Sequence, residues 1–120
     1  MQITQCLHAA VLVSELENAE QFYSNVLGLP KVERPLKYRG AWYQVGEFQV
    51  HLIEHPNFRV EPPNYEKLGR NPHIAVGVAN VEEAKERLQA HGHPTQMSAS
   101  GRAALFTQYP DGNIIEMTQV

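Results

Sequence analysis

The feature that most constrains the fold of this chain is an internal repeat with an offset of 65 residues. Ala19 and Tyr23 lie on the apolar face of one predicted helix, and Ala84 and Leu88 lie at the corresponding positions of a second. Each predicted helix is followed by a Gly-x-Pro sequence, which ends a helix because proline cannot continue it. A chain of 120 residues can form one compact unit or two very small modules that share a core, and the repeat favours two modules.

Each copy of the repeat is predicted to contain one strand, one helix and three further strands. Capping sequences mark both helix starts, since Ser14 precedes Glu17, and Asn80 precedes Glu83, by three residues. Strands are indicated by runs of β-forming residues between turn signals, such as Gly46-Glu47 and the Pro-Asp-Gly sequence at 110–112. The runs that we identify lie at residues 7–13, 31–34, 41–45, 48–54, 74–78, 103–108 and 113–119.

The predicted fold is therefore α+β, with two βαβββ modules at about residues 1–55 and 72–120. The segment 56–71 between them is rich in proline and polar residues and is predicted to be a connector. Together the modules are expected to form a single domain that spans residues 1–120.

The same offset relates four potential metal ligands. It carries His8 onto His73 and His51 onto Glu116, and each of the four lies in or beside an apolar, strand-like run. If two curved sheets related by pseudo-symmetry face each other, equivalent positions converge on one point. The set would supply three imidazoles and one carboxylate, which suits Zn, Fe, Ni, Co or Mn.

Each of these residues also has a structural interpretation. A single histidine in an apolar strand is usually a hydrogen-bonded core residue, and Glu116 alone could pair with an arginine. Taken together the four favour a metal site, because an unpaired buried glutamate is costly and three internal histidines need partners. His55, His91 and His93 lie in the connector or around a helix end, and we predict that they are not ligands.

Composition excludes several classes of partner. The net charge of −3 and the pI near 6.0 give no basic field for nucleic acid, and no 18 apolar residues run together to cross a membrane. The N-terminal sequence lacks the charged and apolar regions of a signal peptide. The single cysteine, Cys6, cannot form an internal disulfide, which fits a reducing compartment. We therefore expect a soluble, cytoplasmic protein.

Four stretches, LHAAVLVSELENAEQFYSNVLGL, GAWYQVGEFQVHLIEH, PHIAVGVANVEEAKERLQAHG and LFTQYPDGNIIEM, together resemble the vicinal oxygen chelate superfamily. This group includes glyoxalase I, fosfomycin-resistance proteins, methylmalonyl-CoA epimerase, extradiol dioxygenases and bleomycin-resistance proteins. The resemblance implies paired βαβββ modules that form a cupped, partly open mixed β-sheet barrel around one divalent ion. The ligand positions that it implies are His8, His51, His73 and Glu116. At His51 this sequence differs from glyoxalase I, which usually has glutamate there, and from the epimerases, which have glutamine.

The resemblance also implies a function and an assembly. The leading hypothesis is a glyoxalase-like lyase or isomerase that stabilises an enolate or alkoxide of a small, metal-chelating substrate, with Glu116 as the catalytic base. One alternative is an Fe(II) ring-cleaving dioxygenase, and another is a non-catalytic protein that binds small molecules and confers resistance. Catalysis requires open coordination positions, whereas a closed tetrahedral zinc shell would be structural. The family favours a homodimer, in which the site can be shared between subunits.

Two questions stay open in the sequence. Only one of Trp42 and Tyr43 can face the metal, and counting across the turn at Gly46 does not decide which. Arginines at positions 34, 39, 59 and 70 are candidates for binding an anionic group of the substrate, although arginines in connectors are usually solvated.

Overall fold

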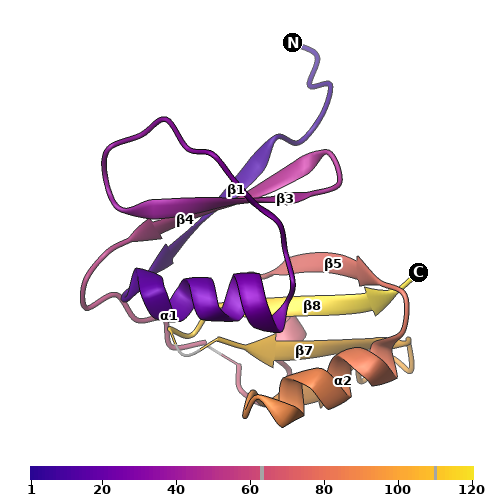
Figure 1. Cartoon of the computed structure of the whole chain (residues 1–120). Helices are drawn as coiled ribbons and strands as arrows, with labels where there is room; N and C mark the ends of the chain where they lie inside the picture. The colour runs from indigo at the N-terminus through magenta and orange to yellow at the C-terminus, as the bar shows by residue number, and fades with distance from the viewer. Residues whose placement is uncertain (63, 110) are drawn as a thin grey trace. The chain divides into compact units, whose positions relative to one another are not determined.

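The computed structural model describes residues 1–62, 64–109 and 111–120, and it divides into two units, Met1–Phe58 and Arg59–Val120. Figure 1 shows one sheet with its own helix in each unit. The first unit contains β1 (His8–Val13), α1 (Leu16–Glu20), η1 (Gln21–Val26), β2 (Lys31–Val32), β3 (Gly40–Val45) and β4 (Phe48–Glu54). The second contains η2 (Leu68–Arg70), β5 (Ile74–Val78), α2 (Val81–Ala90), β6 (Thr95–Met97), β7 (Ala104–Gln108) and β8 (Ile114–Gln119).

The two sheets have the same topology. Their strand orders are β1-β4-β3-β2 and β5-β8-β7-β6, with the first pair of each sheet parallel and the others antiparallel. The register of the parallel pairs also repeats, because Ala10 lies opposite His51 and Ala75 lies opposite Glu116. The predicted α+β fold with two βαβββ modules is confirmed, although β6 lies in none of the predicted strand ranges.

The first helix differs from its prediction at its start and in its hydrogen-bond pattern, while Gly28 with φ +72° follows its end as predicted. Glu15, not Ser14, is the N-cap residue, and the first helical N–H, that of Leu16, donates to the carboxylate of Glu54 from β4. The second half of the helix is η1, a π-helical segment in which Leu27 N–H donates to the carbonyl of Phe22, five residues earlier. The second helix follows its prediction, since the side chain of Asn80 accepts from Glu83 N–H.

Strand alternation gives each sheet one apolar face and one face with polar side chains. In the first unit Val11, Val13, Tyr43, Val50 and Leu52 are buried on the face that the helix covers. In the second unit Leu105, Ile115 and Met117 are buried in the same way on the side of α2, which contacts β7 and β8 (Figure 1). The opposite face of each sheet carries the predicted ligands.

Most of the predicted connector belongs to the second unit. Leu68 of η2 packs with Phe106 and Ile114, so this segment contributes to the core. Of the predicted turn at 110–112, Pro110 lies outside the described residues. Gly112 has φ +92°, and the carbonyl of Val60 lies where a side chain at position 112 would begin.

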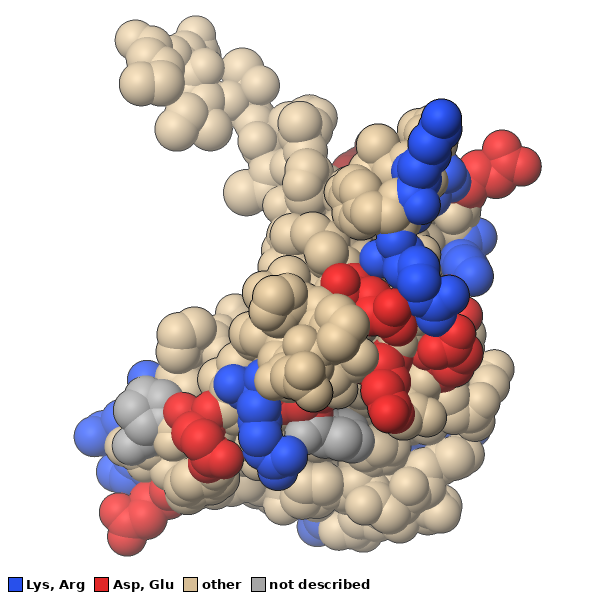
Figure 2. Space-filling view, turned by 90° about the vertical axis from the view of Figure 1, so that its left-hand side faces the viewer, with Lys and Arg blue, Asp and Glu red and all other residues tan. Residues whose placement is uncertain are grey.

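The surface carries charges of both signs. On the face drawn in Figure 2, acidic and basic side chains lie among each other. No helix in the described part of the chain has the length and apolarity that crossing a bilayer requires.

Candidate metal centre

The first unit brings His8 and His51 together. Their rings stack with centroids 4.0 Å apart and planes 12° from parallel. The other side of His51 stacks on Trp42, with centroids 4.1 Å apart, because Trp42 lies directly opposite His51 in the β3–β4 ladder. His51 is therefore buried between two rings, whereas His8 is exposed at the start of β1.

A chain of amide hydrogen bonds fixes the orientation of the His51 ring. Gln44 Nε2 donates to the backbone carbonyl of Gly46 at 2.7 Å, so Gln44 Oε1 accepts from Gln49 Nε2 at 2.8 Å. Gln49 Oε1 then faces His51 Nε2 at 2.8 Å and accepts a hydrogen bond from its N–H. Neutral His51 consequently carries its lone pair on Nδ1, which makes Nδ1 the nitrogen available to a metal.

The second unit brings His73 and Glu116 together. His73 Nδ1 lies 2.7 Å from the carbonyl of Asn71, which only accepts, so Nδ1 carries the proton. The lone pair of the neutral ring is then on Nε2, which lies 3.1 Å from Glu116 Oε2. Both atoms then present a lone pair to the other, and two such acceptors repel each other unless a cation lies between them. That cation is either a proton or a metal ion. A backbone carbonyl on the far ring nitrogen is the usual support of a metal-binding histidine.

The two oxygens of Glu116 have different roles. Oε1 accepts hydrogen bonds from Arg102 at 2.9 Å and from Thr118 at 3.1 Å, whereas Oε2 is directed to His73. The rings of His73 and Phe106 also contact each other in a T-shaped arrangement, with centroids 5.5 Å apart. Arg102 and Thr118 thus orient the carboxylate so that one oxygen is presented with the His73 nitrogen.

The electrostatic surroundings favour the ligand forms of two of these groups. Burial lowers the pKa of His51, and the electrostatic influence of His8 and Arg34 lowers it further, so the ring is neutral at pH 7. Burial raises the pKa of Glu116, but hydrogen bonds from Arg102, Thr118 and His73 outweigh it and hold the pKa below its usual value. Glu116 is therefore ionised at pH 7.

The donors within each unit are of kinds that divalent ions bind. The first unit offers two imidazole nitrogens, and the second offers one imidazole nitrogen and one carboxylate oxygen; no three His, Cys, Asp or Glu side chains gather at one point within the described residues. In the first unit His8 and His51 would each supply an imidazole nitrogen to such an ion. Trp42 and Gln49 hold the His51 ring in place, whereas His8 is exposed.

The structure answers the open question about the aromatic pair and adds residues that the sequence did not indicate. Trp42 lies on the face of His51, while Tyr43 is buried on the other face with its hydroxyl 2.8 Å from Ser24 Oγ. Thr118 could be expected beside Glu116 from alternation. Arg102 lies in the loop before β7, where no periodic signal identifies a contact with β8.

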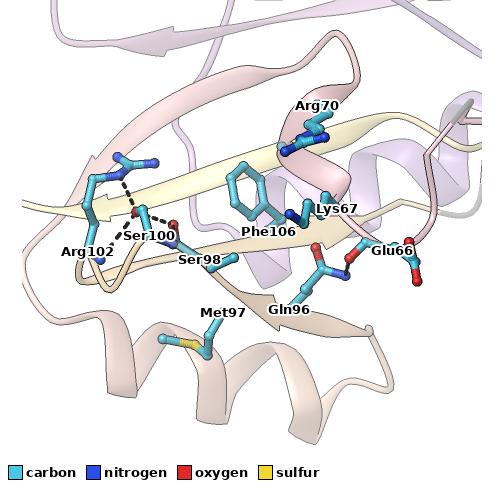
Figure 3. Close-up of a pocket in the computed structure, with 11 residues that line it drawn as sticks. Glu66, Lys67, Arg70, Gln96, Met97, Ser98, Ser100, Arg102 and Phe106 are labelled. Atoms are coloured by element: carbon cyan, nitrogen blue, oxygen red, sulfur yellow. Dashed lines mark hydrogen bonds between the residues drawn. The ribbon is translucent and has the colours of Figure 1, made fainter.

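A pocket of about 450 Å³ lies in the second unit, and its lining includes Phe106, which contacts His73, and Arg102, which bonds to Glu116. Figure 3 shows Phe106 between Ser100 and Arg102 on one side and Lys67 and Arg70 on the other. Arg102 Nε donates to Ser100 Oγ at 3.1 Å, so the arginine that orients Glu116 also forms part of the pocket wall. The volume is in the range of pockets that bind small molecules.

Comparison with known proteins identifies a family and several relatives. The sequence model of the Glyoxalase/Bleomycin resistance protein/Dioxygenase superfamily matches residues 5–117. The lactoylglutathione lyase of Salmonella typhimurium is 29% identical over 94% of this chain and 90% of the relative. The mitochondrial methylmalonyl-CoA epimerase of Homo sapiens is 28% identical over 93% of this chain and 72% of the relative. A glyoxalase family protein from Bacillus anthracis shares the fold, with a TM-score of 0.79, 24% identity and coverage of 99% and 97% of the two chains.

Proposed function

The chain belongs to the Glyoxalase/Bleomycin resistance protein/Dioxygenase superfamily, as its motifs predicted, and on this premise we propose that it is a divalent-metal-dependent lyase or isomerase of the glyoxalase type. His8, His51, His73 and Glu116 are the proposed ligands of one ion, which would be Zn, Ni, Co, Mn or Fe. The observation that carries the proposal is the pair formed by His73 Nε2 and Glu116 Oε2, with the far ring nitrogen held by a backbone carbonyl.

The proposed chemistry begins with a small substrate that has two neighbouring oxygens. When bound, the ion would accept these oxygens and stabilise the negative charge of an enolate or alkoxide. Glu116 is the proposed base, because its low pKa keeps it ionised and Oε2 is the oxygen free of Arg102 and Thr118. The pocket beside Phe106 and Arg102 is the proposed location of the rest of the substrate.

Metal analysis is the first test. Protein stripped with a chelator is titrated with each of the five metals, and the same titration is made on His73→Ala and Glu116→Gln. His91→Ala is the matched control, since His91 is exposed at the end of α2 and its ring lies 2.9 Å from the carbonyl of Arg87, away from the proposed ligands. Both site variants are expected to lose binding and the control to keep it. Unchanged binding in both site variants would contradict the ligand assignment.

The coordination of the ion separates catalysis from a structural role. The cobalt-substituted protein is expected to absorb weakly, as five- or six-coordinate cobalt does, because catalysis needs open positions. Strong tetrahedral absorption would mean a closed shell of four protein ligands and would remove the catalytic proposal. The names of the relatives give two substrates to try first, lactoylglutathione and methylmalonyl-CoA.

We further propose that the protein is a cytoplasmic homodimer. Each four-stranded sheet ends in an edge strand, and pairing between subunits is one way to cover such edges. The segment between β4 and β5 is long enough for the second unit to complete a site with its own first unit or with that of a partner chain.

A further inference from the structure

The loop between β2 and β3 holds an arginine whose hydrogen-bonding capacity is only partly used. Arg34 Nη1 donates to the carbonyl of Leu36 at 3.3 Å. Nε and Nη2 are both buried, and neither has a hydrogen-bond partner among the described residues. These two nitrogens form one edge of the guanidinium, and a buried donor without an acceptor has lost its hydration without compensation.

The surroundings of Arg34 hold this edge in place. The ring of Tyr38 stacks on the guanidinium, with the central carbon 4.4 Å from the ring centroid. Gly40 lies against the group, since a Cβ at this position would come within 3.0 Å of Nη2 and 3.1 Å of the central carbon. A side chain at position 40 would therefore fill the space that the guanidinium occupies.

Arg34 lies on the same face of the sheet as the His51 pair. Gly40 and Trp42 are two residues apart in β3, so both face the side on which Trp42 stacks on His51. Arg34 and Gly40 also line a surface pocket of about 430 Å³ within the first unit. Arg34 thus lies on the same face of this sheet as the ring stack of the candidate metal centre.

We propose that the Nε–Nη2 edge of Arg34 binds the carboxylate of a small, singly charged substrate. The two parallel N–H groups of this edge match the two oxygens of a carboxylate. Tyr38 covers one face of the guanidinium, so we expect the carboxylate to approach in the plane of the group. The substrate class, a carboxylic acid whose other oxygens chelate the ion, rests on the proposed function. The anion site itself does not need the metal.

The charge of the pocket favours a monoanion over a phosphate dianion. Lys31 also lines the pocket, but its ammonium pairs with Glu20 at 2.8 Å. Glu33 adds a negative charge to the lining and makes no ion pair with Arg34. The pocket therefore offers one guanidinium edge without a hydrogen-bond partner among the described residues, next to one carboxylate, and this is too little positive charge for a dianion.

Nuclear magnetic resonance of the metal-free protein tests the proposal directly. The Nε–H signal of Arg34 is assigned by its loss in Arg34→Lys, and the protein is titrated with propionate, with the neutral analogue propionamide and with inorganic phosphate at constant ionic strength. Propionate is expected to shift this signal saturably, propionamide to leave it unchanged, and phosphate to bind more weakly. Equal shifts from propionate and propionamide, or no shift from either, would overturn the proposal.

Variants test whether binding depends on the two parallel N–H groups of Arg34 or only on its positive charge. Arg34→Lys keeps the charge but lacks the fork, so propionate binding, followed at the indole N–H of Trp42, should weaken roughly tenfold. Arg59→Lys is the matched control, because Arg59 is exposed and belongs to the second unit. Equal affinity in Arg34→Lys and the wild type would refute the assignment, and if that variant does not fold, the comparison of propionate with propionamide in the wild type still decides.

The test also distinguishes this inference from the proposed function. Propionate binding without any metal binding would leave the anion site standing and remove the metal-dependent function. Metal binding without propionate binding would remove the anion site alone.

Discussion

Replacing Thr118 by valine should weaken metal binding without changing any proposed ligand. The hydroxyl of Thr118 donates to Glu116 Oε1 at 3.1 Å, and valine has the same shape without the donor. A hydrogen bond to a charged group contributes about 1.5–3 kcal/mol. This bond is long, Thr118 is partly exposed, and Arg102 still holds Oε1, so we expect a loss of about 1 kcal/mol, or about fivefold in Kd.

Competition with a chromophoric chelator measures this change. Thr95→Val is the matched control, because Thr95 lies in β6 of the same sheet and bonds to Gln89, not to Glu116. Valine suits a strand, so both variants should keep the thermal stability of the wild type within a few degrees. A Kd within twofold of the wild type in Thr118→Val, with binding lost in Glu116→Gln, would refute the argument that Thr118 orients the carboxylate.

Three further predictions concern assembly, pH dependence and backbone conformation. If the site is shared between two subunits, mixing the His8→Ala and Glu116→Ala proteins should restore one intact metal site per heterodimer. Heterodimers that form without binding metal would place the site within one chain. A monomer in sedimentation would contradict the dimer itself. Hydrogen bonds from Arg39 and from Leu16 N–H hold the pKa of Glu54 below its ordinary value. The stability that this carboxylate contributes is therefore present above the ordinary glutamate pKa of about 4.3, and it is lost as the pH falls through the lower pKa of the folded state. Denaturation should therefore show Glu54→Gln less stable than the wild type at pH 7, with the difference shrinking below pH 4; a constant difference would contradict this. Gly112→Ala should lower the free energy of unfolding in urea by about 2 kcal/mol or more, because φ is +92° and the new Cβ would lie 1.8 Å from a backbone carbonyl oxygen. Gly28→Ala is the control, and it should cost only about 1 kcal/mol because φ is +72° and the space around it is open. Equal losses would show that the close contact has no effect.

The repeat and its strands were readable from the sequence because their signals are local. Alternation, helix spacing and the glycines after each helix depend on neighbouring residues, so the ranges of β4 and β5 were predicted as observed. The offset that relates His51 to Glu116 is preserved in the register of the parallel strands. β6 escaped prediction because Thr95–Met97 contains no run of β-forming residues.

The start of the first helix shows where local signals fail. The sequence placed its cap at Ser14, but the first N–H of α1 is satisfied by Glu54, which is distant along the chain. The choice between Trp42 and Tyr43 was likewise open until pairing placed Trp42 opposite His51.

The sequence by itself determined the fold class and the four candidate ligands, while the tertiary structure decided which groups support them. Gln49 and Thr118 could be expected from alternation, but their hydrogen bonds required the positions of the side chains. Arg34 and Arg102 come from loops, and a loop sequence does not specify which strand its side chains will contact. A strand's periodicity fixes the direction of its own side chains, but a contact between segments that are distant in sequence depends on register and loop path, which only the folded chain defines.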